Sequence, residues 1–252
     1  MTAPLLRVRD LTVRYGGVIA LGGIDLDVAE GSITGLIGPN GAGKTTFIDV
    51  VSGFTAPSAG RVLLRDRVLV DRSPHQRARQ GMARTFQSLE LFEDLTVREN
   101  LAVAAARPRR WELFGDLWWP RRPAGSAVDD VIDELDLAGH AHRLPAELPN
   151  GARHLVGLAR ALVSDPVLLL LDEPAAGLDT GETARLGRLL ATFPERGVTT
   201  LLVEHDMSIV LGVCDTVHVL DFGGLIASGT PAEIRRDPRV ISAYLGTAGG
   251  VG

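Results

Sequence analysis

The sequence predicts an α/β fold with a mainly parallel sheet, an antiparallel β layer and an inserted helical subdomain. Three observations carry this prediction. A glycine-rich loop, residues 38–46, joins a short apolar stretch to a helix-like one. Toward the C-terminus, apolar stretches alternate with helix-like stretches, which is typical of a sheet of mainly parallel strands. Between these parts, residues 88–162 show helical periodicity and no convincing strand.

The first part of the chain alternates apolar and polar residues, as half-exposed strands do. The alternation covers residues 5–15, 24–28 and 61–70, and it predicts the antiparallel β layer. Residues 33–37 form an apolar run, which predicts a buried strand that enters the glycine-rich loop. The helix that leaves the loop is expected to bury Phe47, Ile48, Val50 and Val51.

Two helices are predicted in the middle of the chain. Ser126 is expected to cap the first, whose apolar face comprises Val128, Val131, Ile132 and Leu135. The apolar face of the second comprises Leu155, Leu158, Ala159 and Leu162. Residues 167–171, 198–203 and 216–220 then predict buried strands. We therefore expect one domain with an α/β core of residues 1–87 and 163–252 and a helical subdomain of residues 88–162.

Residues 108–123 are rich in arginine, proline and tryptophan. Trp111, Phe114 and Trp118 share a helical face, with arginines at both ends of the segment. We interpret this face as a local hydrophobic patch that closes the subdomain. The alternative is contact with a membrane protein or with lipid headgroups.

The composition narrows the possible functions. A net charge of −5 and a pI near 5.7 argue against a general nucleic-acid binder. Cys214 is the single cysteine, which excludes an intrachain disulfide and a cysteine-based zinc site. No stretch reaches the run of about 18 apolar residues that a membrane span needs. We therefore expect a cytosolic chain, in which any membrane role depends on another subunit.

Residues 38–46, GPNGAGKTT, fit the phosphate-binding P-loop pattern Gly-x-x-x-x-Gly-Lys-Thr. Its glycines let the backbone turn tightly and approach a phosphate, and N–H groups at a helix start attract the anion. In this pattern Lys44 reaches the β- and γ-phosphates, and the Thr45 hydroxyl ligates Mg²⁺. The predicted nucleotide contacts in the loop are Gly38, Asn40, Gly41, Ala42, Gly43, Lys44, Thr45 and Thr46.

An acidic pair completes a hydrolytic site. Asp172 and Glu173 directly follow the apolar strand at residues 167–171. The carboxyl end of such a strand is where α/β proteins bind ligands. Asp172 is expected to hold Mg²⁺, partly through water, and Glu173 to activate an attacking water.

These motifs together resemble the ATP-binding subunit of an ABC transporter over nearly the full length of the chain, within the P-loop NTPase class. The resemblance implies that Tyr15 stacks on adenine, with Val18 beside it. It implies that Gln87, in Arg84-Thr85-Phe86-Gln87, ligates Mg²⁺ and water and senses the permease. It also implies that residues 176–179 form the D-loop and that His205 contacts the γ-phosphate.

Several segments are similar to the ATPases of branched-chain amino-acid importers. They are residues 15–21, 99–104, 204–207 and 241–246. The ATPases of urea and short-chain amide importers look much alike, so the class of the solute stays open between these groups.

The chain departs from the family at its signature motif, Leu-Ser-x-Gly-Gln. The aligned residues are Leu148-Pro149-Asn150-Gly151-Ala152, so Pro149 replaces the serine and Ala152 the glutamine. In this family two subunits face head to tail, and each ATP lies between one P-loop and the other chain's signature. Asn150 and Gly151 are therefore expected to contact ATP in trans, in a weakened site. A heterodimer with a second ATPase would confine that weakness to the site on the partner's P-loop.

The resemblance implies ATP hydrolysis with Lys44, Gln87, Glu173 and His205 as the catalytic set and ATP with Mg²⁺ as cofactors. It implies permease subunits, a second ATPase subunit and, indirectly, a solute-binding protein as partners, no nucleic acid, and a peripheral position on the cytoplasmic side of the cell membrane. Alternatives are a non-transport ABC ATPase acting on ribosomes or DNA, and a regulatory ATP-binding subunit with weak turnover. A P-loop GTPase or kinase is disfavoured, because the guanine motif Asn-Lys-x-Asp is absent from the sequence.

Overall fold

The structure is a computed structural model that describes residues 4–86, 90–106 and 124–248. The chain divides into two compact units, one formed by Met1–Gln87 with Val167–Gly252 and the other by Ser88–Pro166. The tryptophan- and arginine-rich segment predicted at residues 108–123 lies outside the described residues. Within the described ranges, no helix has the length and apolar character that crossing a bilayer requires.

The first unit begins with the predicted antiparallel layer. Its sheet has the strand order β2-β1-β4-β5. Inward-facing apolar residues such as Leu6 and Val8 are almost completely buried, whereas Arg7 and Arg9 are more exposed, as the alternation in the sequence predicts. The strands are β1 (Pro4–Tyr15), β2 (Val18–Ala29), β4 (Ala59–Leu64) and β5 (Arg67–Val68).

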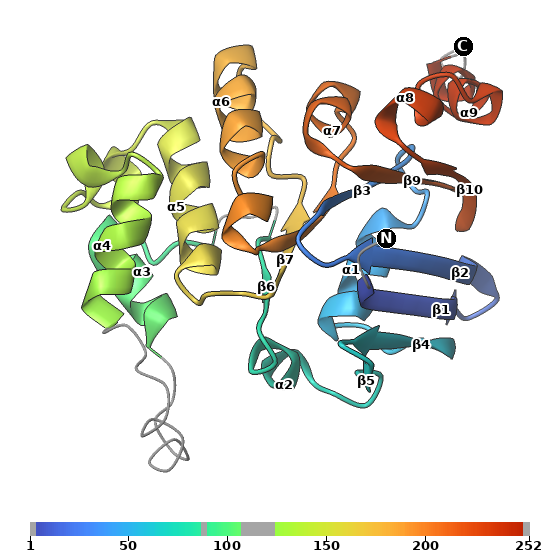
Figure 1. The fold of residues 1–252 in the computed structure, drawn as a ribbon, viewed down its shortest axis with the longest axis horizontal. Coiled ribbons are helices and arrows are strands. Elements are labelled where there is room, and N and C mark those ends of the chain that lie inside the picture. Colours follow the sequence, from blue (N-terminus) through green and yellow to red (C-terminus); the bar gives the residue numbers. More distant parts are fainter. Residues whose placement is uncertain (1–3, 87–89, 107–123, 249–252) are drawn as a thin grey trace. The chain divides into compact units, whose positions relative to one another are not determined.

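A second sheet in this unit carries the order β10-β9-β3-β8-β7-β6 (Figure 1). The central strand β3 pairs in parallel with β8 on one side and β9 on the other, while β10 pairs with β9 antiparallel. Strands β3, β7 and β8 are buried along their whole length, as expected for strands covered on both faces. The strands are β3 (Ile33–Ile37), β6 (Met82–Arg84), β7 (Leu168–Asp172), β8 (Thr199–Val203), β9 (Thr216–Asp221) and β10 (Gly224–Gly229).

Helix α1 (Lys44–Ser52) joins the two sheets, because its apolar face packs into a core formed by residues from both. The C-terminal end of α1 is held by Arg77, whose Nη1 donates to the carbonyls of Val50 and Val51 at 2.6 and 2.7 Å. Arg77 Nε also donates to the Arg72 carbonyl at 2.9 Å, and the side chain is buried. The other helices of this unit are α2 (Pro74–Ala78), α6 (Thr180–Leu190), α7 (Met207–Val213), α8 (Pro231–Ile234), α9 (Pro238–Ala248) and the 3-10 turn Pro194–Arg196.

The second unit is helical in its described part, as predicted. Helix α3 (Val97–Ala105) packs against both α4 (Ala124–Glu134) and α5 (Asn150–Leu162), with 3-10 turns at Ala138–His140 and Pro145–Glu147. The predicted start of α4 is wrong by three residues, because a cap at Ser126 would start the helix at residue 127, whereas the helix begins at Ala124 and includes Ser126. Thr96 and Glu99 form a reciprocal capping box at the start of α3, which explains why that helix begins there.

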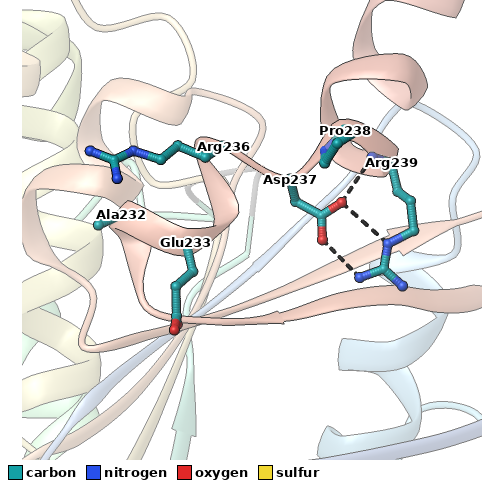
Figure 2. A pocket seen from close by; sticks show the side chains of 6 residues that line it. All are labelled: Ala232, Glu233, Arg236, Asp237, Pro238 and Arg239. Atoms are coloured by element: carbon teal, nitrogen blue, oxygen red, sulfur yellow. Dashed lines mark hydrogen bonds and ion pairs between the residues drawn. The ribbon is translucent and has the colours of Figure 1, made fainter.

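A surface pocket lies where α8 meets α9, and Figure 2 shows the side chains that line it. Asp237 accepts hydrogen bonds from the backbone N and the guanidinium of Arg239 at 2.7–3.2 Å. Glu233 accepts from the backbone N and hydroxyl of Thr230. Both acids of the pocket are thus engaged, and none of the predicted nucleotide residues lines it.

Candidate functional site

The P-loop occupies the turn between β3 and α1, as the sequence predicts. Gly38 packs so closely against β9 that a Cβ there would lie 2.1 Å from the Leu220 carbonyl oxygen. Gly41 has open space around it, but its φ of +81° is a conformation that side-chain-bearing residues rarely adopt. Gly43 precedes α1 with φ 104° and no side-chain cap, which leaves the first turn of the helix to bind an anion.

Lys44 lies at the base of this loop and is buried. Its ammonium donates to the carbonyls of Gly38 and Pro39 at 2.7 and 3.1 Å, so the same side chain that is expected to meet phosphate also holds the loop closed. Burial lowers the pKa of Lys44, and the negative charges of Glu173, Glu204 and Asp172 oppose that effect. These three carboxylates are therefore the acidic groups whose charge acts on the Lys44 ammonium.

The acidic pair lies where the sequence predicts, at the C-terminal end of β7. Asp172 is the last residue of the strand and is buried, with its carboxylate bonded to Arg84. Glu173 follows in a left-handed conformation, with φ 47° and its backbone N bonded to the Val203 carbonyl at 2.9 Å. Strained backbone of this kind is concentrated at functional sites, where the surrounding structure holds it in place.

His205 lies beside Glu173 and is the second residue after the end of β8. Its Nδ1 is 3.6 Å from Glu173 Oε2, and its side chain is 54% exposed. The structure thus brings together Lys44, Asp172, Glu173 and His205, which belong to three separate segments of the sequence.

Glu204 is a site residue to which the sequence assigned no role. Its side chain is completely buried and accepts hydrogen bonds from the backbone N of Ala175, His205 and Asp206 at 2.9, 3.0 and 3.4 Å. Burial raises the pKa of Glu204, and the backbone donors counteract the shift. The carboxylate therefore ties the segment after Glu173 to the segment that carries His205. The sequence signal that could have identified Glu204 is an acidic residue directly after an apolar run. The same pattern identified Asp172.

The expected adenine platform is exposed at the turn end of the β1–β2 hairpin, where β1 leads into β2. Tyr15 and Val18 are paired in the strand register, and their side chains are 54% and 68% exposed. Asn40, Gly41 and Thr45 are exposed on the loop, Gly43 and Thr46 are half-buried, and Gly38 and Ala42 are buried. Gln87 lies outside the described residues.

The remaining predicted residues lie at helix starts. Pro149 is the residue before α5 and has extended backbone, so Asn150 and Gly151 form the first turn of that helix in the second unit. The helix lacks a side-chain cap, because proline has none to offer where the family pattern places serine. In the first unit, Asp179 of the predicted D-loop caps α6 in a reciprocal box with Glu182.

Comparison with known proteins explains this combination of loop, acidic pair and histidine. The family model described as ABC transporter matches residues 21–176, and the model described as branched-chain amino acid ATP-binding cassette transporter matches residues 225–249. The chain belongs to the ABC transporter family. As the ATP-binding subunit of an ABC transporter, it is an ATPase, which confirms the prediction from the sequence.

Individual relatives agree with this assignment. The chain is 43% identical to the high-affinity branched-chain amino acid transport ATP-binding protein LivG of Escherichia coli over 98% of its length and 100% of that protein. It is 39% identical to BraF of Pseudomonas aeruginosa over 98% of this chain and 100% of BraF. The solved ATP-binding cassette MJ1267 superposes with a TM-score of 0.86 at 30% identity, covering 96% of this chain and 99% of that one. These cassettes confirm the predicted fold class.

Proposed function

We propose that this ABC ATPase drives an importer of branched-chain amino acids or of a related small polar solute. The observation that carries the solute class is the full-length identity of 43% with LivG, supported by the match of residues 225–249 to a family model named for that transport. We place the chain at the cytoplasmic face of the membrane, bound to permease subunits that receive solute from a binding protein.

The proposed chemistry is in-line attack of water on the γ-phosphoryl of ATP. Glu173 takes the proton from the attacking water, and Lys44, the loop N–H groups and His205 stabilise the charge that develops. Tyr15 and Val18 hold the adenine. The separation of 3.6 Å between His205 Nδ1 and Glu173 Oε2 suits two groups that act on one phosphoryl centre from neighbouring positions.

The site also has the donor chemistry of a Mg²⁺ site. Mg²⁺ prefers oxygen ligands, keeps several waters, and is usually held by one or two carboxylates together with the substrate phosphates. Asp172 supplies a buried carboxylate and Thr45 an exposed hydroxyl, and the described residues hold no cluster of three or more acids, histidines or cysteines that would form a full protein cage. We assign Thr45, Asp172 and Gln87 as its ligands, partly through water. When bound, the ion neutralises charge on the β- and γ-phosphates.

The altered signature supports a heterodimer with a second ATPase subunit. Pro149 and Ala152 remove the hydroxyl and amide that the family pattern places against the partner's ATP, whereas Asn150 and Gly151 keep a helix start there. In a homodimer both ATP sites would carry this defect. In a heterodimer the P-loop of this chain faces the partner's own signature, and one site keeps the full set of contacts.

The decisive experiment is copurification followed by transport. The tagged chain should bring down a multispanning permease and a second ATPase, and the reconstituted complex should take up radiolabelled leucine in an ATP-dependent manner. Lys44→Ala, which removes the phosphate-binding ammonium, serves as the inactive control. Uptake of urea or a short-chain amide without leucine would refute the solute class. Recovery with ribosomes instead of a permease would refute the transport function.

A further inference from the structure

Arg84 connects the two halves of the proposed metal site. It ends β6, a short edge strand that runs parallel to β7. Its Nη2 is 2.8 Å from Asp172 Oδ2, and its Nη1 is 2.7 Å from Asp49 Oδ1 and 2.8 Å from the Ser52 hydroxyl. One guanidinium thus binds a carboxylate at the end of β7 and two oxygens on α1.

The ion pair is shielded from water. The side chains of Arg84 and Asp172 are 8% and 9% exposed. The guanidinium carbon lies 5.6 Å from the ring centroid of Phe54 and 4.8 Å from that of Phe86, and the two rings meet edge to face at 5.5 Å. These aromatic contacts favour the cation and limit its movement. The fork of the guanidinium then fixes the direction in which it presents its donors.

We propose that Arg84 is a positioning residue that orients the carboxylate of Asp172 toward Mg²⁺, an inference that rests on the proposed ATPase site. Holding Oδ2 of Asp172 fixes the rotation of the carboxylate and leaves Oδ1 facing a constant direction. Asp172 ends β7 directly before Glu173, whose carboxylate lies 3.6 Å from His205, so the Asp172 carboxylate belongs to the same cluster as the proposed base. Partners of this kind, one contact removed from a metal, tune metal affinity about 10–100-fold.

The second arm of Arg84 sets the distance between the two proposed ligands. Asp49 lies one helical turn after Thr45 on α1, so both project from the same face of that helix. A cation that binds Asp49 and Asp172 together therefore holds the Thr45 turn against the end of β7. Thr85 reinforces this edge, because its backbone N donates to the Leu170 carbonyl at 2.9 Å and its hydroxyl accepts from Asp172 N at 3.4 Å.

A purely structural role makes a different prediction. Arg84→Met removes one partner of a buried ion pair and leaves Asp172 as an uncompensated buried charge, so we expect a lower melting temperature whichever role Arg84 has. The dependence of nucleotide binding on Mg²⁺ therefore separates metal positioning from folding. If Arg84 only links α1 to β6, its loss changes the melting temperature and leaves the dependence on Mg²⁺ untouched.

The test measures ADP affinity of the full chain by calorimetry, in EDTA and across a series of Mg²⁺ concentrations. Arg84→Met should keep its metal-free ADP affinity within about twofold, while half-saturation by Mg²⁺ shifts upward about 10-fold or more. Arg84→Lys keeps the positive charge but lacks the two-armed guanidinium. Its Mg²⁺ half-saturation should therefore lie between those of the wild type and Arg84→Met. Arg79→Met, which replaces an exposed arginine outside the site, is the matched control and should keep the Mg²⁺ half-saturation of the wild type.

A double-mutant cycle shows whether Arg84 acts through Asp172. Adding Arg84→Met to Asp172→Asn should cause no further shift in Mg²⁺ half-saturation, because the oriented carboxylate is already gone. An unchanged Mg²⁺ half-saturation in Arg84→Met overturns the proposal, as does an equal loss of ADP affinity with and without the ion. If Arg84→Met does not fold, the same measurement is made on Arg84→Lys. A wild-type dependence of ADP affinity on Mg²⁺ in Arg84→Lys would then overturn the proposal. These readouts need no transport, so they fail or succeed independently of the proposed solute.

Discussion

The hydrogen bonds of Arg77 make the clearest stability prediction. Arg77 is buried and donates to three carbonyls, two of them at the end of α1. Burial lowers its pKa, which shows that the charge is costly where it lies. Hydrogen bonds from a charged donor contribute about 1.5–3 kcal/mol each, whereas burying the ion costs several kcal/mol. We therefore expect Arg77→Met to lower the free energy of unfolding by about 2–4 kcal/mol.

The assay is thermal and urea unfolding of the isolated chain, followed by circular dichroism. For a unit of this size, about 1 kcal/mol shifts Tm by roughly 2–4 °C, so Arg77→Met should melt about 4–16 °C lower. Arg79→Met, an exposed arginine two residues away, is the matched control and should change the free energy of unfolding by about 0.5 kcal/mol at most. A decrease in the free energy of unfolding below about 1 kcal/mol, or one equal to that of the control, would refute the reasoning. It would show that the hydrogen bonds of the guanidinium only offset the cost of burying its charge.

Three further predictions concern the site and its pH dependence. Glu173→Gln should bind ATP normally and hydrolyse it at least about 100-fold more slowly in single-turnover assays, and normal turnover would show that the base is misassigned. Introducing serine at Pro149 together with glutamine at Ala152 should raise ATPase activity of the assembled complex about 10-fold, and no gain would show that this signature does not limit turnover. Burial lowers the pKa of His218 despite the opposing influence of Asp27, so the folded protein favours the neutral ring. Its stabilising contribution is complete above the unfolded-state pKa of about 6.5 and is lost as the pH falls toward the lowered folded-state pKa. His218→Leu should flatten that part of the Tm profile, and an unchanged slope would contradict the assignment.

The parts of the fold that depend on local sequence were predictable. The P-loop and the acidic end of β7 depend on residues adjacent in sequence, so the motif and the apolar run were enough to predict them. Strand β6 was missed because it spans only Met82–Arg84, too short for any periodicity to show. Strand β10 was missed because glycines stand at both of its ends and a serine interrupts its apolar residues.

Two buried charges near the site escaped prediction for a different reason. Glu204 and Arg84 are residue types that are rarely buried unless they are paired. Their partners are far away in the sequence, since Glu204 accepts from Ala175 and Arg84 binds Asp172. A sequence pattern indicates burial through apolar neighbours and cannot show which distant group will compensate a charge. Such residues become visible only when the tertiary contacts are known.

The position of β3 between β8 and β9 has a consequence for how the chain folds as it is synthesised. The P-loop follows a strand whose two neighbours are made more than 160 residues later, and Gly38 packs against Leu220. Non-local parallel pairing of this kind forms slowly, because the intervening chain loses conformational entropy before the strand contacts stabilise the structure. The strands of the β1–β2 hairpin, by contrast, are adjacent in sequence and can pair as soon as both have been synthesised. A nascent chain therefore carries the complete P-loop sequence long before β8 and β9 are available to pack against it, and we expect ATP binding only after β9 has been synthesised.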